Sequence, residues 1–76
     1  MEDMKLILKV KSSEDVLIRI TSVFHSRGFK IRSLNYCEEL ESAKMYVTAY
    51  GQEGRQEQMI NQLAKLHDIM EAQRAY

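Results

Sequence analysis

The side chains of this sequence that could carry out chemistry are few and scattered. Cys37 is the only cysteine, and His25 and His67 are the only two histidines. A single thiol can form neither an internal disulfide nor a cysteine-based zinc site. Neither histidine has metal-ligand spacing to another donor, and no activating motif surrounds Cys37. We therefore expect no catalytic residue and no metal site, and a protein that binds and regulates a partner without catalysing a reaction.

The stretch from Leu8 to Leu17 is the most informative place for a binding site. It passes from an alternating run through a short polar loop into a helical pattern, and the free amides of a helix N-terminus can hold a carboxylate. Ser12, three residues before Asp15, also fits plain helix capping, with the acidic side chain in the first turn. Both interpretations stay open, and the candidate effector loop is Ser12, Ser13, Glu14, Asp15, Val16 and Leu17.

The first half of the chain predicts a strand and a helix. Apolar residues occupy alternate positions from Met4 to Val10, which is typical of a half-buried strand over Met4 to Lys11. Apolar residues then recur at three- and four-residue spacing from Val16 to Phe24, which indicates a helix of about four turns. Gly28 is the expected left-handed residue after that helix.

The next segment, from Phe29 to Cys37, predicts a second strand with an irregularity. Phe29 and Ile31 share one face, whereas Leu34 and Tyr36 share the opposite one, so the alternation slips near Ser33. A β-bulge restores inward facing after such a slip and is common on edge strands. We therefore place this strand at an edge, with the candidate dimer-forming residues Phe29, Ile31, Ser33, Leu34 and Asn35.

The remaining chain predicts a strand, a helix and a weaker last strand. The polar segment Glu38 to Ser42 suits a hairpin connection, and its three glutamates fit a solvated tip. A strand follows in which Met45, Val47 and Ala49 alternate with Tyr46, Thr48 and Tyr50. A second amphipathic helix runs from Arg55 to about His67, and a last strand lies within Asp68 to Tyr76. The outward side of the second helix is expected to hold Gln56, Glu57, Asn61, Gln62 and Lys65.

The predicted order is therefore βαββαβ, an α+β ferredoxin-like sandwich. Each helix has a single apolar stripe, so both helices must cover one face of a four-stranded antiparallel sheet. Copper-carrying domains of this fold need two cysteines where this chain has Ser12 and Ser13. RNA-binding domains need stacking aromatics on the central strands, and only Tyr46 and Tyr50 answer that requirement.

Length and composition set further bounds. The chain has 76 residues, so residues 1–76 are expected to form a single domain, and a domain this small gains from assembling into an oligomer. Eleven basic and eleven acidic residues give a formal net charge of zero, which favours neither nucleic acid nor an anionic membrane. No secretion signal or membrane-spanning run is recognisable, and a lone cysteine fits a reducing compartment, so we expect a cytoplasmic protein.

Three runs of this sequence together resemble the ACT domain of acetolactate synthase (acetohydroxyacid synthase) small subunits. The resemblance covers nearly the whole chain, and its middle and last runs are fairly specific to that family among ACT domains. The chain is also similar in length to the short form of the subunit. The runs are Val16-Leu17-x-Arg19-Ile20, Phe24-x-x-Arg27-Gly28-Phe29-x-Ile31-x-Ser33-Leu34 and Gln62-Leu63-x-Lys65-Leu66-x-Asp68.

The resemblance implies a non-catalytic regulatory subunit in branched-chain amino-acid biosynthesis. Such subunits bind and activate a catalytic chain that depends on thiamine diphosphate, magnesium and in some cases FAD, and this chain is expected to bind none of these itself. They pair their ACT domains side by side, which implies a homodimer. A free-standing ACT domain that senses another small molecule, and a ferredoxin-like nucleic-acid binder, are the alternatives.

One departure from the family pattern bears on feedback inhibition. Valine-sensitive members resemble one another in an Asn-rich loop with a glycine before the helix, where this chain has Ser12, Ser13, Glu14 and Asp15. The glycine lets a ligand approach the backbone amides, whereas Asp15 adds a side chain and a negative charge. Together with Glu14 it could satisfy the helix amides internally. We therefore expect valine feedback to be weak or absent.

Overall fold

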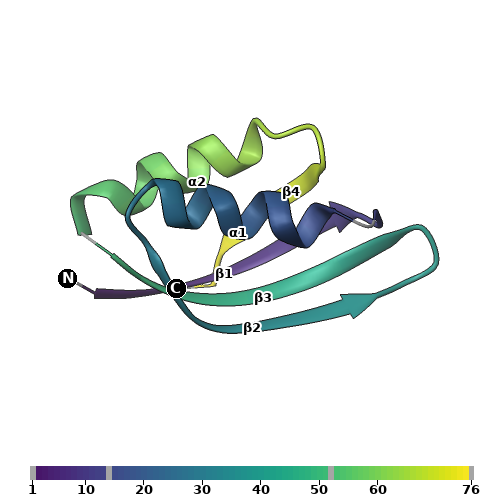
Figure 1. Cartoon of the computed structure of the whole chain (residues 1–76), viewed down its shortest axis with the longest axis horizontal. Helices are drawn as coiled ribbons and strands as arrows, with labels where there is room; N and C mark the ends of the chain where they lie inside the picture. Colours follow the sequence, from purple (N-terminus) through teal and green to yellow (C-terminus); the bar gives the residue numbers. More distant parts are fainter. Residues whose placement is uncertain (1, 14, 52, 76) are drawn as a thin grey trace.

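The computed structural model describes residues 2–13, 15–51 and 53–75. Along the chain they form four strands, two α-helices and one turn of 3-10 helix (Figure 1). The elements are β1 (Glu2–Lys11), α1 (Val16–Ser26), β2 (Lys30–Glu38), β3 (Ser42–Gly51), the 3-10 helix η1 (Glu53–Arg55), α2 (Gln56–Ala64) and β4 (Ile69–Arg74).

The strands form one antiparallel sheet in the order β2-β3-β1-β4. Both helices lie on the same face of this sheet, and the other face is left open (Figure 1). The predicted α+β ferredoxin-like βαββαβ sandwich is thus confirmed. Neither α1 nor α2 has the length and apolar character needed to cross a membrane.

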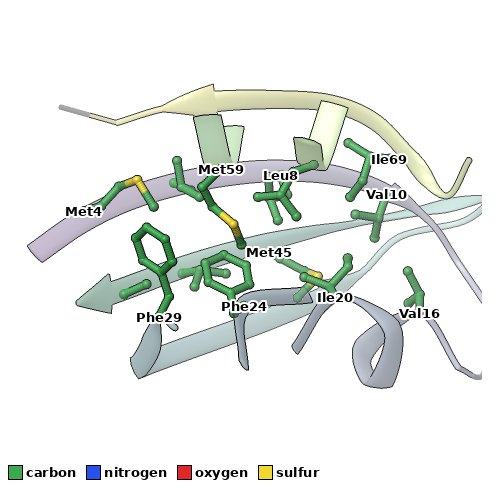
Figure 2. Close-up of a cluster of buried hydrophobic side chains, with 14 of the residues drawn as sticks. Met4, Leu8, Val10, Val16, Ile20, Phe24, Phe29, Met45, Met59 and Ile69 are labelled. Carbon is green, nitrogen blue, oxygen red and sulfur yellow. The ribbon is translucent and has the colours of Figure 1, made fainter. Parts of the chain in front are cut away.

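The core lies between the helices and the inner face of the sheet. The alternation in β1 is confirmed: Met4, Leu6, Leu8 and Val10 are each no more than 1% exposed. Figure 2 shows Met4, Leu8 and Val10 in one cluster with labelled side chains of both helices, such as Phe24 and Met59. Burying one such side chain stabilises the fold by about 1.5–3 kcal/mol. The remaining buried apolar residues are Val16, Ile20, Phe24, Phe29, Ala43, Met45, Val47, Ala49, Met59, Leu63 and Ile69.

A Schellman turn ends α1 and directs the chain into the sheet. The amide of Phe29 donates to the carbonyl of Phe24 at 2.9 Å, and the amide of Gly28 donates to that of His25 at 3.1 Å. Gly28 has a φ of 80°, which an L-residue adopts only with strain, so its predicted role is confirmed. The rings of Phe24 and Phe29 pack edge to face with centroids 6.4 Å apart, and Figure 2 shows them side by side.

Strand β2 is an edge strand with a bulge, as predicted. Its register with β3 shifts between Ile31 and Ser33, which leaves Arg32 as the extra residue. After the shift, Leu34 and Tyr36 lie opposite buried residues of β3 and turn towards the helices. The strand begins at Lys30, one residue later than predicted, because Phe29 is taken up by the turn after α1 and is 5% exposed.

The expectation that Gln56 faces outward is wrong. Gln56 is 1% exposed, and its Oε1 accepts a 2.6 Å hydrogen bond from Nη2 of Arg74 on β4. The periodicity of the sequence identifies apolar residues on the buried side of a helix. It cannot identify a buried polar residue such as Gln56, because the hydrogen-bond partner of that residue lies on another element. Helix α2 is also shorter than predicted, beginning at Gln56 and ending at Ala64.

Gly51 lies where the ring of Phe29 leaves no room for a side chain. A Cβ added to Gly51 would lie 2.4 Å from Cδ2 of Phe29, and the ring cannot retreat without disturbing its packing on Phe24. We expect Gly51→Ala to lower the free energy of unfolding by about 1–3 kcal/mol, measured by urea denaturation. Gly54→Ala is the matched control, because nothing lies within 4 Å of a Cβ there. Equal stability of the two variants would contradict this account of Gly51.

Candidate functional site

The two segments expected to form sites meet at one corner of the sheet. Lys11, the last residue of β1, lies opposite Ser42 of β3, and Glu38, the last residue of β2, lies opposite Ala43 of the same strand. The loop after β1 therefore starts beside the end of the edge strand. Ser12 Oγ donates a 2.7 Å hydrogen bond to Oε2 of Glu38 and joins the two segments directly.

The residues of the candidate effector loop have different surroundings. Ser12, Ser13 and Asp15 are exposed, and Glu14 lies outside the described residues. Val16 is 1% exposed and belongs to the core, and Leu17 is half-buried against it. Among the described loop residues, Ser12, Ser13 and Asp15 are therefore open to a ligand, while the two apolar members fix the start of α1.

The expected capping of α1 by Ser12 is wrong. The N-cap residue is Asp15, which has a φ of −107° and makes no side-chain hydrogen bond to the helix amides. Ser12 instead bonds Glu38, and the Ser13 hydroxyl donates to Oδ1 of Asp15 at 3.4 Å. The expectation that the Asp15 carboxylate satisfies the helix amides is wrong for the same reason, because that carboxylate turns to Arg19.

Arg19 is the centre of the polar contacts at this corner. Its Nη2 donates to Oδ2 of Asp15 at 2.8 Å, and its Nη1 donates to Oδ2 of Asp68. The Asp68 side chain is 12% exposed, and its backbone carbonyl accepts a 2.9 Å bond from the amide of Lys11. Arg19 thus ties the start of α1 to the connection between α2 and β4. In the sequence, the four-residue spacing of Asp15 and Arg19 was the signal for part of this contact, and nothing signalled the bond to Asp68.

The candidate dimer-forming residues of β2 are divided between its two faces. Ile31 and Leu34 are half-buried and pack against the core, whereas Ser33 and Asn35 are exposed on the open side of the sheet. Strand β2 has one neighbour, β3, so its other edge pairs with no described strand. This edge is nine residues long, against six for the opposite edge strand β4, and offers more unpaired backbone to a partner.

A groove runs between α1 and the connection that follows α2. It has a volume of about 500 Å³ and is lined mainly by apolar atoms of Ile18, Val23 and Leu66, with Arg19 and Asp68 at its side. Ile18 is 67% exposed, although it lies on a helix that otherwise packs its apolar residues inward. Among the described residues, none covers the apolar surface of this groove in the helical layer.

The ion pair at the start of α1 perturbs the ionisation of Asp15. The hydrogen bond from Arg19 holds the pKa of the Asp15 carboxyl below its ordinary value of 3.8. A carboxyl with a lowered pKa contributes stability above its ordinary pKa, and that contribution is lost as the pH falls through the lowered value.

We expect Arg19→Gln to bring the Asp15 pKa back towards 3.8, measured by carboxyl NMR titration. Arg27→Gln, at the far end of α1, should leave it lowered, and an unchanged Asp15 pKa in Arg19→Gln would contradict this cause.

Comparison with known structures gives several domains of the same fold. The small subunit of acetolactate synthase from Thermotoga maritima superposes with a TM-score of 0.83 at 20% identity, covering 97% of this chain and 47% of the other. This chain thus spans about half of that subunit. The ACT domain of GTP pyrophosphokinase from Chlorobium tepidum superposes with a TM-score of 0.79 at 11% identity, covering 95% of both chains. The regulatory subunit of aspartate kinase from Thermus thermophilus superposes with a TM-score of 0.74 at 12% identity, covering 97% of this chain and 50% of the other.

Comparison of the sequence itself identifies the family. None of the curated proteins matches the chain significantly in sequence. A family model described as an ACT domain matches residues 12–72, which begins in the candidate effector loop and ends in β4. The match covers most of the chain and both helices, and it agrees with the fold of the similar structures. This chain belongs to the ACT domain family.

Proposed function

We propose that this ACT domain is the non-catalytic activating small subunit of acetolactate synthase, of the short form. Its support is the three sequence runs that resemble those small subunits, together with a superposition on one of them at a TM-score of 0.83. ACT domains are regulatory modules that catalyse no reaction. In this proposal the thiamine diphosphate, the magnesium and any FAD belong to the catalytic chain, and the complex works in the cytoplasm.

The contact between Arg19 and Asp68 is the observation that carries the proposal. Arg19 belongs to the first of the three runs and Asp68 to the last, and they lie 49 residues apart in sequence. Their side chains nevertheless bond each other beside the effector loop. The middle run supplies the turn at Gly28 and the inward-facing Ile31 and Leu34 of the edge strand. Residues of the first and last runs thus meet at one corner of the domain, whereas the middle run forms the turn at the other end of α1 and part of the edge strand.

We propose further that the chain works as a homodimer that pairs β2 with β2 of a second copy. The long unpaired edge of β2 and its bulge favour such pairing. A side-by-side dimer would continue the sheet across both copies and bring two effector loops to the shared surface, because Ser12 bonds the last residue of β2. Small size favours the same arrangement, since a second copy covers surface that one copy leaves exposed.

Reconstitution with the catalytic chain tests this function. The purified chain is mixed with the catalytic subunit of acetolactate synthase from the same organism, and complex formation is followed by size-exclusion chromatography with light scattering. We expect a stable complex and a several-fold rise in kcat. The catalytic chain mixed with an unrelated protein of similar size is the control. Failure to form a complex at micromolar concentrations, with both proteins folded, would exclude the proposed role.

The effector loop supports weak or absent feedback by valine. The Asp15 carboxylate is exposed beside the helix N-terminus, where an amino-acid carboxylate would have to bind. Arg19 bonds both Asp15 and Asp68 and so already has two carboxylate partners. Glu38, bonded to Ser12, brings another carboxylate to the same corner. A ligand carboxylate would therefore meet like charges.

Calorimetry with valine tests this part of the proposal. We expect the wild-type chain to show weak or no heat of binding, and Asp15→Gly to bind valine more tightly because the variant removes the charge and the side chain. The φ of −107° at residue 15 is open to any residue, so the substitution requires no backbone change. Asp15→Asn is the matched control that removes the charge and keeps the size. Tight binding of valine by the wild-type chain would refute weak feedback.

A free-standing ACT sensor is the second candidate. The similar structures include ACT domains from proteins of several kinds, among them the domain of a GTP pyrophosphokinase that matches this chain over 95% of its length. A sensor would show a melting temperature that rises with its small-molecule ligand in the absence of any protein partner. The reconstitution experiment separates the two candidates, because only the subunit changes the turnover of the catalytic chain.

A further inference from the structure

The open face of the sheet is basic, although the chain as a whole has a formal net charge of zero. Inward residues of β1 and β3 alternate with residues that face away from the helices, and the registers show which side chains share this face. Among the described strand residues, six basic residues and two acidic residues share this face, and Nζ of the outermost, Lys11, lies 3.2 Å from Nε2 of His67. The basic residues are Lys5, Lys9, Lys11, Lys30, Arg32 and Lys44, and the acidic residues are Asp3 and Glu71.

Part of this charge is neutralised within the face, and part is not. Nη1 of Arg32 lies 3.4 Å from Oδ1 of Asp3. Cζ of the same guanidinium lies over the ring of Tyr50, 5.6 Å from the ring centroid. Lys9 and Lys44, by contrast, lie directly opposite each other on the two central strands. Within the described chain no ion pair involves either of them. Like charges directly opposite in a sheet are destabilising. Among the described residues Glu71, opposite Lys9 on β4, sets one carboxylate against the two lysines, so a partner with further negative charge would stabilise the arrangement.

An apolar centre lies beside the two lysines. Ile7 is opposite Tyr46, and Tyr46 is 45% exposed although it stands in the middle of the sheet. Ile7 lines two adjoining hollows of this face. One, of about 340 Å³, also includes Asn35 and Tyr46, and the other, of about 140 Å³, includes Lys9 and Lys44. An exposed apolar centre with a charged surround is the usual anatomy of a protein interface.

The chemistry of this face favours an acidic protein surface over other occupants. A second copy of the same face would bring like charges together. Single-stranded nucleic acid needs several open aromatic rings, whereas Tyr50 is covered by Arg32 and β1 offers Ile7 in the position opposite Tyr46. An apolar side chain flanked by carboxylates matches both hollows.

We propose that the open sheet face, defined here by Ile7, Lys9, Lys44 and Tyr46, is the surface that docks onto an acidic, partly apolar patch of the catalytic subunit. This inference rests on the proposed function and specifies the surface that it uses. The docking surface is separate from the β2 edge, so one copy can pair with another through β2 while its sheet face binds the catalytic chain (Figure 1).

Lys44→Glu is the variant that separates binding from folding. It places a carboxylate opposite Lys9 and replaces a repulsive cross-strand pair with an attractive one, so the melting temperature should stay the same or rise. Affinity for the catalytic subunit, measured by biolayer interferometry, should fall about tenfold or more. Lys65→Glu at the end of α2 is the matched control on the helical layer, and it should bind as the wild-type chain does. Binding by the wild-type chain should weaken with added salt more steeply than binding by Lys44→Glu.

The outcomes distinguish this inference from the proposed function. Wild-type binding that Lys44→Glu leaves unchanged would overturn the docking surface and keep the function, and loss of binding only in Lys65→Glu would move the contact to the helical layer. A wild-type chain that does not bind the catalytic subunit at all would overturn both. Salt-sensitive binding of a short polyuridine RNA that Lys44→Glu abolishes, with binding of the catalytic subunit unaffected, would make this face a nucleic-acid surface instead.

Discussion

Burial of one side of β1 is the constraint on which the rest of this structure depends. This strand lies between β3 and β4, and its inward side chains from Met4 to Val10 are almost completely withdrawn from solvent beneath the helices. Because side chains alternate along a strand, fixing these residues inward also fixes Lys5, Ile7 and Lys9 on the open face. The same alternation therefore determines both the core and the face on which we place the docking surface.

The turn after α1 transmits the packing of the helix to the edge of the sheet. Gly28 allows the reversal, Phe29 enters the core against Phe24, and Gly51 leaves the space that the Phe29 ring needs. The chain then enters β2, where the bulge at Arg32 turns the following apolar residues inward. A strand so anchored keeps one edge unpaired while its inward side is held by the core, which suits a surface that pairs with another copy.

Charge is distributed unevenly over a chain that is neutral as a whole. At the corner beside the effector loop, the guanidinium of Arg19 bonds the carboxylates of Asp15 and Asp68, and the carboxylate of Glu38 accepts a hydrogen bond from Ser12. On the open face, basic residues are in excess and two lysines lie opposite each other. A neutral total therefore conceals a cluster of carboxylates beside the effector loop and an excess of basic residues on the open face. Composition averages over both and detects neither.

The sequence by itself determined the elements, their order and the sheet edge, because alternation, helical spacing, Gly28 and the slip near Ser33 are local patterns that backbone geometry requires. It also determined membership of the ACT domain family, which the resemblance predicted and the match over residues 12–72 shows. Only the tertiary structure decided the polar partners. Arg19 bonds Asp68 across 49 residues and Gln56 bonds Arg74 across 18, and Ser12 turns to Glu38 instead of capping α1. Such contacts depend on where separate elements pack, which residue spacing along one element does not record.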